Sequence, residues 1–262
     1  MMMREGERLS FAGDTNVCDY MDFACAPGGE AALVSSVLRS LSEEPWRELA
    51  LWAMREDSAT LAALPAVCAE LGLTIAVEEE DVCPQVPLPG TWDDYVATLD
   101  KKDRHELRRK LRRLPQAGEV TFEALETPAE IAPALDDFVR MYAQSRSDKA
   151  AFLTPEQETF LRRIALTLAS EGLAEMTFLS LNRRRVAGVL SFVGPDEVML
   201  YNSGYDPAYR EFSVGLLSKA MTLERAIQHG KRRFDFLRGP EPYKYDLGAR
   251  DFKVFRCVIQ RT

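Results

Sequence analysis

The sequence is an acidic chain of 262 residues, in which 33 lysines and arginines stand against 41 aspartates and glutamates. Its hydrophobic content of 46% is that of an ordinary water-soluble globular protein, and its net charge of −8 argues against uniform coating of nucleic acid, leaving room for a local basic patch. No stretch approaches the roughly 18 to 20 apolar residues that cross a bilayer, and no apolar signal segment is visible at the start, so we expect a cytoplasmic protein without a transmembrane segment.

The first half of the chain alternates short strands with amphipathic helices. A continuous apolar run at 49–53 predicts a strand that is buried on both faces, and apolar residues at helical spacing predict helices on both sides of it. A small α/β layer follows from this order. The strands are expected at 17–23, 49–53 and 73–77, and the helices at 33–41 and 57–71, with Asp57 as the N-cap of the second.

An acidic and then proline-rich connection, 78–91, leads to a basic helix. Thr91 is expected to cap a short helix at 92–99, and a second helix is predicted at 102–114. The run 101–113 holds eight of the 33 lysines and arginines, while its leucines recur on one side, so its other faces are cationic. We place the domain boundary near Pro115, giving an N-terminal domain, 1–115, and a C-terminal domain, 116–262.

The second half predicts two helices, then a meander, then a crossover. Three strands separated by very short gaps can only be antiparallel neighbours. A helix with a wide apolar stripe and a further strand follow them, which predicts a right-handed parallel connection. The helices are expected at 131–145, 155–170 and 213–229, and the strands at 176–181, 185–193, 198–203 and 233–236.

That order of strands and helix is the core of the GNAT acyltransferase fold. The stretches at 201–210, 213–217 and 234–239, with Glu241-Pro242-Tyr243-Lys244, resemble the C-terminal half of the CelD-type acetyltransferases. This GNAT branch is related to the FemAB/FemX peptidyl transferases. Pro89-Gly90-Thr91-Trp92 and the basic run are similar to the middle section of that family. The resemblance implies an α/β fold with a tandem GNAT-like arrangement, in which the N-terminal half is reduced and the C-terminal half complete.

The segment Arg210–Gly215 stands where this family binds the donor's pyrophosphate. The family pattern is Arg/Gln-x-x-Gly-x-Gly/Ala, in which Arg210 and Gly215 match and Ser213 replaces the first glycine. The segment precedes the N-terminus of a long predicted helix, where free N–H groups attract phosphate. We therefore expect Arg210, Ser213, Val214 and Gly215 to bind the cofactor, with Ser213 as N-cap; the alternative is an ordinary capped helix start.

Acid–base and substrate-binding candidates surround the last predicted strand. Asp235, Glu241 and Tyr245 are the candidate acids and bases. Asp235 comes first, because a carboxylate turned into an apolar site acquires a raised pKa. A structural carboxylate that caps the next loop is the alternative for Asp235. Solvated or core side chains are the alternatives for the substrate-binding candidates, which are Tyr201, Tyr205, Arg238, Tyr243, Lys244, Arg108 and Arg109.

The resemblance implies transfer of an acyl group, acetyl above all, from an acyl-CoA to an amine or hydroxyl of a cell-envelope or polysaccharide precursor. The expected partners are a small-molecule or sugar- and amino-containing acceptor, an anionic ligand at the helix 101–113, and a second copy in a homodimer. Five irregularly spaced cysteines without a CxxC pair predict reduced thiols and no metal. The alternatives are a FemX-like transferase that uses aminoacyl-tRNA and a non-catalytic binding module with a GNAT fold.

Overall fold

The computed structural model describes residues 2–261, which form two compact units. The first unit contains the chain up to Pro84, Arg238–Pro240 and the chain from Asp251 onward, and the second contains Gln85–Leu237 and Glu241–Arg250. This division differs from the boundary expected near residue 115, because residues 85–115 belong to the second unit and a strand close to the C-terminus belongs to the first.

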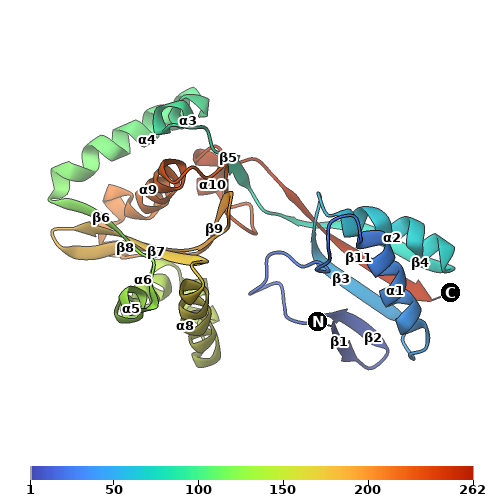
Figure 1. The fold of residues 1–262 in the computed structure, drawn as a ribbon. Helices are drawn as coiled ribbons and strands as arrows, with labels where there is room; N and C mark the ends of the chain where they lie inside the picture. Colours follow the sequence, from blue (N-terminus) through green and yellow to red (C-terminus); the bar gives the residue numbers. More distant parts are fainter. Residues whose placement is uncertain (1, 262) are drawn as a thin grey trace. The chain divides into compact units, whose positions relative to one another are not determined.

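The first unit is built on a five-stranded sheet whose order is β1-β2-β3-β11-β4 (Figure 1). β11 (Lys253–Arg261) was not predicted, and it lies antiparallel between β3 (Glu48–Arg55) and β4 (Leu73–Val82). The sheet of this unit is therefore completed from within the chain. The remaining strands are β1 (Met2–Glu5) and β2 (Arg8–Phe11).

Two helices, α1 (Glu30–Ser42) and α2 (Ala59–Glu70), pack on this sheet around a core that includes Leu49 and Leu51. Both helices were predicted, but Ser58 rather than Asp57 is the N-cap of α2. The Asp57 carboxylate instead accepts two hydrogen bonds from the Arg55 guanidinium, at 2.8 and 3.0 Å.

The strand expected at 17–23 is wrong. The N–H groups of Val17 and Cys18 both donate to the carbonyl of Asp14, and this turned segment leads into irregular chain. A turn that begins at Asp14 thus takes the first of these backbone groups, and farther along the N–H of Met21 donates to the Ala53 carbonyl of the strand at 48–55, at 3.0 Å.

The second unit contains a six-stranded sheet of order β5-β10-β9-β8-β7-β6. The predicted meander and parallel crossover are confirmed: β7, β8 and β9 pair antiparallel, and β10 pairs parallel with β9. Two short outer strands were missed. The strands are β5 (Gln85–Pro87), β6 (Val120–Leu125), β7 (Ala174–Leu181), β8 (Arg184–Val193), β9 (Glu197–Tyr205) and β10 (Arg233–Asp235).

Helices cover both faces of this sheet (Figure 1). α9 (Val214–Gln228) packs on one face, with α3 (Trp92–Thr98) and α4 (Lys101–Arg113) beyond it, and α6 (Leu135–Ser145) and α8 (Pro155–Ser170) pack on the other. A separate hydrophobic core fills each side. The short helices are α5 (Pro128–Ile131), α7 (Ser147–Phe152) and α10 (Pro242–Asp246), with 3-10 turns η1 (Leu114–Ala117), η2 (Ala132–Ala134) and η3 (Pro207–Phe212).

Close packing fixes the end of β9, from which the chain enters η3. A Cβ atom on Gly204 would lie 2.3 Å from the backbone nitrogen of Tyr142 in α6, so only glycine permits this approach. None of the helices in the described chain is both long and apolar enough to cross a membrane.

Candidate functional site

A cavity of about 480 Å³ opens at the N-terminal end of α9. All four predicted cofactor-binding residues line it, together with two of the predicted substrate-binding tyrosines. Three of its side chains are basic and one is acidic, so the cavity suits an anion. Its lining residues are Lys110, Tyr205, Arg210, Ser213, Val214, Gly215, Leu216, Lys219, Tyr243 and Asp246.

The loop before α9 leaves backbone donors free at the cavity. Ser213 has φ of 57°, the left-handed conformation that favours glycine, which is the residue the family pattern places there. In this conformation its hydroxyl makes no capping hydrogen bond, so the expected side-chain cap is wrong. In the described part of the chain, no hydrogen bond uses the N–H of Val214 or Gly215, and both groups lie at the positive end of the helix dipole.

Gly215 is required by a neighbouring ring. A Cβ atom at this position would lie 2.8 Å from Cδ1 of Tyr205, which is closer than side chains normally pack. Tyr205 itself rests on the hydrophobic core beneath α9. The glycine therefore lets β9 and α9 pack closely, in addition to any room it leaves for a ligand.

Lys219 is a cavity residue that the sequence analysis missed. Its side chain is 8% exposed, and its Nζ donates to the Gly215 carbonyl at 2.7 Å and lies 4.7 Å from the centre of the Tyr243 ring. Burial, with the neighbouring Lys149 as a second cause, lowers the pKa of Lys219 to about 7. Helical spacing could have found it, because Lys219 follows Gly215 by four residues and shares its face.

The segment after β10 places Tyr243 at the cavity and Lys244 away from its lining. Lys244 is 1% exposed, donates to the Leu237 carbonyl at 2.7 Å and forms an ion pair with Glu241 at 2.9 Å. Burial, and then the negative charge of Glu241, raise the pKa of Tyr243. Of the three predicted acids and bases, Glu241 is thus the one whose charge reaches two cavity residues, Tyr243 and Lys219.

Asp235 is fully buried, and both of its carboxylate oxygens accept hydrogen bonds. One accepts from Nε2 of Gln85 at 2.8 Å and the other from the N–H of Leu237 at 2.7 Å, where Leu237 has a positive φ. These are the contacts of a carboxylate that holds the turn after β10. None of the three predicted acids and bases, Asp235, Glu241 and the half-buried Tyr245, lines the cavity.

Two other predicted substrate-binding residues lie elsewhere. Tyr201 stacks on Phe192, with ring centroids 4.5 Å apart, in the core on the opposite face of the sheet. Arg238 belongs to the first unit, where its guanidinium lies 3.7 Å from Glu80 and 3.5 Å from Asp81. The structure therefore does not gather these two residues with the cavity.

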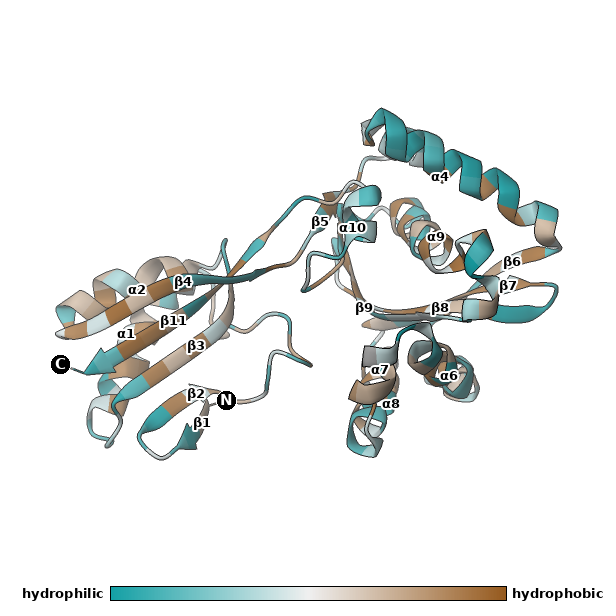
Figure 2. Cartoon of the chain, turned by 180° about the vertical axis from the view of Figure 1, so that it is seen from behind, coloured by the Kyte–Doolittle hydropathy of each residue, from teal (hydrophilic) through white to brown (hydrophobic). Residues whose placement is uncertain are grey.

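The basic helix α4 is hydrophilic along nearly its whole length (Figure 2). Arg109 is engaged by two hydrogen bonds to Glu106, at 2.7 and 2.8 Å, which lower the pKa of Glu106 to about 2. Arg108 is exposed and forms no ion pair with any described residue. It lines a surface groove of about 640 Å³ with Lys101, Lys102, Arg104, His105 and Glu106.

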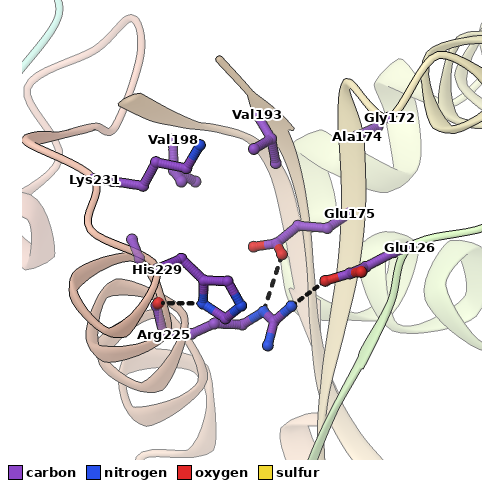
Figure 3. Close-up of a pocket in the computed structure, with 10 residues that line it drawn as sticks. Glu126, Gly172, Ala174, Glu175, Val193, Val198, Arg225, His229 and Lys231 are labelled. Atoms are coloured by element: carbon purple, nitrogen blue, oxygen red, sulfur yellow. Dashed lines mark hydrogen bonds and ion pairs between the residues drawn. The ribbon is translucent and has the colours of Figure 1, made fainter. Parts of the chain in front are cut away.

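A second cavity, of about 260 Å³, lies at the other end of α9 (Figure 3). Arg225 forms ion pairs there with Glu175, at 3.0 Å, and with Glu126. Its cation is thus already matched by two carboxylates, and none of the residues singled out in the sequence lines this cavity.

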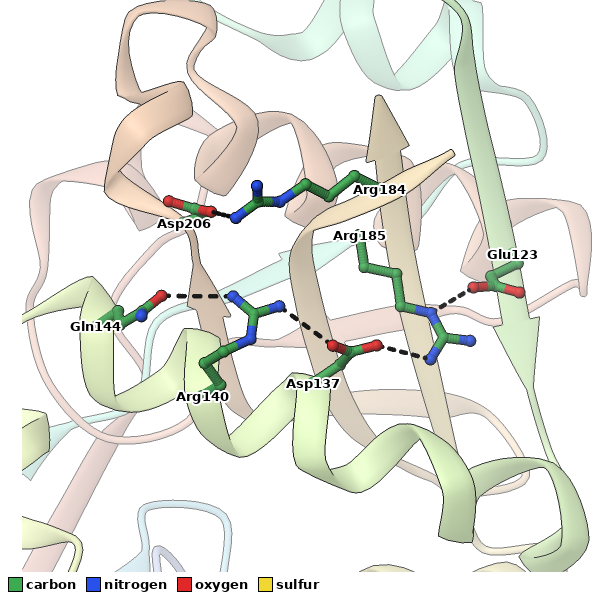
Figure 4. A network of polar contacts seen from close by, with 7 residues as sticks. All are labelled: Glu123, Asp137, Arg140, Gln144, Arg184, Arg185 and Asp206. Atoms are coloured by element: carbon green, nitrogen blue, oxygen red, sulfur yellow. Dashed lines mark hydrogen bonds and ion pairs between the residues drawn. The ribbon is translucent and has the colours of Figure 1, made fainter. Parts of the chain in front are cut away.

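An ion-pair network supports the loop that leads to the first cavity (Figure 4). Arg184 on β8 contacts Asp206 at 2.8 Å, and the other Asp206 oxygen accepts the N–H of Ala208 at the start of η3. Asp206 therefore ties η3 to the sheet. In the same view, Arg185 links Asp137 of α6 to Glu123 of β6.

Comparisons with known proteins agree with this architecture. A family model described as an acetyltransferase (GNAT) domain matches residues 101–245, more than half of the chain. The solved structure of FemX is similar with a TM-score of 0.63 at 13% identity, covering 86% of this chain and 75% of FemX. No curated protein sequence matches.

Two further solved structures resemble nearly the whole chain. The C-terminal domain of a putative lysylphosphatidylglycerol synthetase from Agrobacterium fabrum has a TM-score of 0.63 at 13% identity, covering 98% of this chain and 79% of that one. A conserved protein of unknown function from Bacteroides thetaiotaomicron has a TM-score of 0.66 at 12% identity, with coverages of 99% and 82%. At such identities the likeness concerns the fold alone.

Proposed function

We propose that this chain, which belongs to the GNAT acetyltransferase family and is thus a GNAT-type N-acyltransferase, uses an acyl-CoA as its donor, acetyl-CoA above all. The acceptor in this proposal is an amine, or a hydroxyl, of a cell-envelope or polysaccharide precursor, and the reaction takes place in the cytoplasm.

One observation carries the choice of donor. The cavity at the start of α9 combines two free backbone N–H groups, of Val214 and Gly215, with the basic side chains of Lys110, Arg210 and Lys219. Backbone donors at a helix N-terminus hold phosphate oxygens, and basic side chains around them neutralise its charge. These residues fit a pyrophosphate, and a thioester bound through it supplies the activated acyl group.

The chemistry asked of this chain is proton removal and charge stabilisation. The attacking amine loses a proton as its nitrogen bonds to the acyl carbon and the carbon–sulfur bond breaks. Glu241 is the proposed base, because its negative charge acts on both Lys219 and Tyr243 at the cavity. Backbone N–H groups next to the acyl carbonyl stabilise the oxygen as it becomes negative.

A thermal-shift series with acetyl-CoA tests the donor. Ligand at about 100 times its Kd stabilises the folded protein by roughly 2.7 kcal/mol, enough for a clear rise in Tm. We expect this rise in the intact chain and a much smaller one in Arg210→Ala, whereas Arg232→Ala, an exposed arginine outside the cavity, serves as the matched control. An unchanged Tm at saturating acetyl-CoA would contradict the proposed donor.

The groove on α4 favours a second candidate, a transferase that takes an aminoacyl group from tRNA, as in the FemX-like alternative. Lys101, Lys102 and Arg108 line this groove, and a row of exposed cations binds a phosphate backbone. Stabilisation by charged tRNA without stabilisation by any acyl-CoA would select this candidate. If neither ligand raises the Tm, the chain is better described as a binding module that has kept a GNAT fold.

A further inference from the structure

Lys219 is a buried amine in the cavity at the start of α9, whose lining holds more basic than acidic side chains. It lies in the second turn of α9, its one hydrogen-bond acceptor is the Gly215 carbonyl at 2.7 Å, and no described carboxylate forms an ion pair with it. An amine has more hydrogens than this one bond uses. A buried cation without a carboxylate partner is costly, so burial favours the neutral amine.

The groups that face Lys219 add more positive than negative charge. Lys149 of α7 and Lys244 of α10 oppose a proton on Lys219, and Glu241, the N-cap residue of α10, favours one. The pKa of about 7 reflects this balance, with burial as the largest cause. The other titratable residues of the cavity are Lys110 on α4, Tyr205 on β9, Arg210 on η3, and Tyr243 and Asp246 on α10.

We propose that Lys219 is a phosphate ligand of the donor site that takes up a proton when the phosphate binds. The inference rests on the proposed function in that it identifies the phosphate as the donor's. A phosphate in the cavity supplies the missing negative charge at Lys219 and so stabilises the ammonium form. Binding and protonation are then linked, and phosphate affinity falls as the pH rises above 7.

Calorimetry in buffers with different ionisation enthalpies measures the linked proton. At pH 8 a lysine with a pKa of about 7 is about one tenth protonated, so full protonation in the complex takes up roughly 0.9 proton per site. At pH 5.5 Lys219 is already protonated and its uptake falls close to zero. Free coenzyme A and inorganic pyrophosphate are the two probes, because they separate the phosphate site from the rest of the donor.

Three variants isolate the residue. Lys219→Met removes the titrating group, and we expect about tenfold weaker binding and loss of the extra proton. Lys219→Arg keeps a permanent charge, so binding is retained while the proton uptake disappears. Lys231→Met is the control, because the Nζ of Lys231 donates to the Gly194 and Pro195 carbonyls and its side chain lines the other cavity.

Each result decides between the two proposals. Coenzyme A that binds with the same proton uptake in the intact chain and in Lys219→Met overturns the role of Lys219 and leaves the donor in place. Pyrophosphate that binds with the lysine-dependent proton, while coenzyme A does not bind, overturns the donor and leaves the phosphate site. If neither probe binds, both proposals are wrong.

Discussion

At the scale of single residues, the sequence identified the loop at the cavity but not what its residues do. Arg210, Ser213, Val214 and Gly215 were found because the family pattern marks them, and all four line the cavity. Lys219 escaped because a lysine in a helix is ordinarily exposed, whereas this one is buried and packs against the Tyr243 ring. The prediction for Lys244 failed in the opposite way. Lys244 was expected to bind a ligand, but its Nζ donates a hydrogen bond to the Leu237 carbonyl.

The close packing of Gly215 against the Tyr205 ring can be tested by substitution. Gly215→Val should lower the free energy of unfolding by roughly 1 to 3 kcal/mol, because its Cβ would press on the Tyr205 ring, 2.8 Å away. Urea denaturation measures this loss. Tyr205→Ala should restore part of the stability when it is combined with Gly215→Val, and a double-mutant cycle gives the coupling. Additive losses in the double variant would show that Tyr205 is not the obstacle.

Among the helices and strands, those with a regular apolar pattern were predicted from the sequence, and those recognised only by pairing with a distant strand were not. The helix 155–170 was predicted residue for residue, because Pro155 marks its first turn and the apolar spacing runs its whole length. β5 and β11 carried no such signal, since each is recognised only by a partner far away in the chain, β10 for the first and β3 and β4 for the second. The spacing of apolar residues within a segment therefore does not predict which distant strand it pairs with.

The exposed cations of the basic helix α4 are expected to bind a polyanion. Replacing Lys101, Lys102 and Arg108 together with glutamine should weaken binding of a polyanion, with heparin or tRNA as the probe, and should flatten its dependence on salt by about three units of slope. Affinity measured across a salt series checks this. The matched control replaces Arg163, Arg183 and Arg232, three exposed arginines outside the groove. Equal salt-dependence slopes in both variants would indicate that α4 is an ordinary solvated helix.

At the scale of the whole molecule, each unit has its own sheet and hydrophobic core, but only the second is nearly continuous in sequence. The N-terminal half was expected to be reduced, and β11, from close to the C-terminus, supplies a central strand of its sheet. The expected homodimer stays a prediction, which a measurement of molecular mass in solution checks.

Fragments test this organisation. Residues 1–115 should fail to fold cooperatively, because without β11 the strands β3 and β4 lose the partner that lies between them. Joining residues 251–262 to residue 84 through a short Gly/Ser linker should restore a cooperative transition, measured by circular dichroism during urea unfolding. The same linker joined to a scrambled 251–262 segment is the control, and a cooperative 1–115 fragment would contradict the assignment of β11.

The central position of β11 also sets an order of events on the ribosome. About 170 residues separate β4 from β11 in the chain, and translation at 5–20 residues per second takes roughly 10 to 30 s to add them. During that interval the inner edges of β3 and β4 remain unpaired. The residues of the six-stranded sheet emerge meanwhile and can pair with one another. Nascent chains of this protein are therefore most exposed to chaperones and to edge-to-edge association through the unit that is synthesised first.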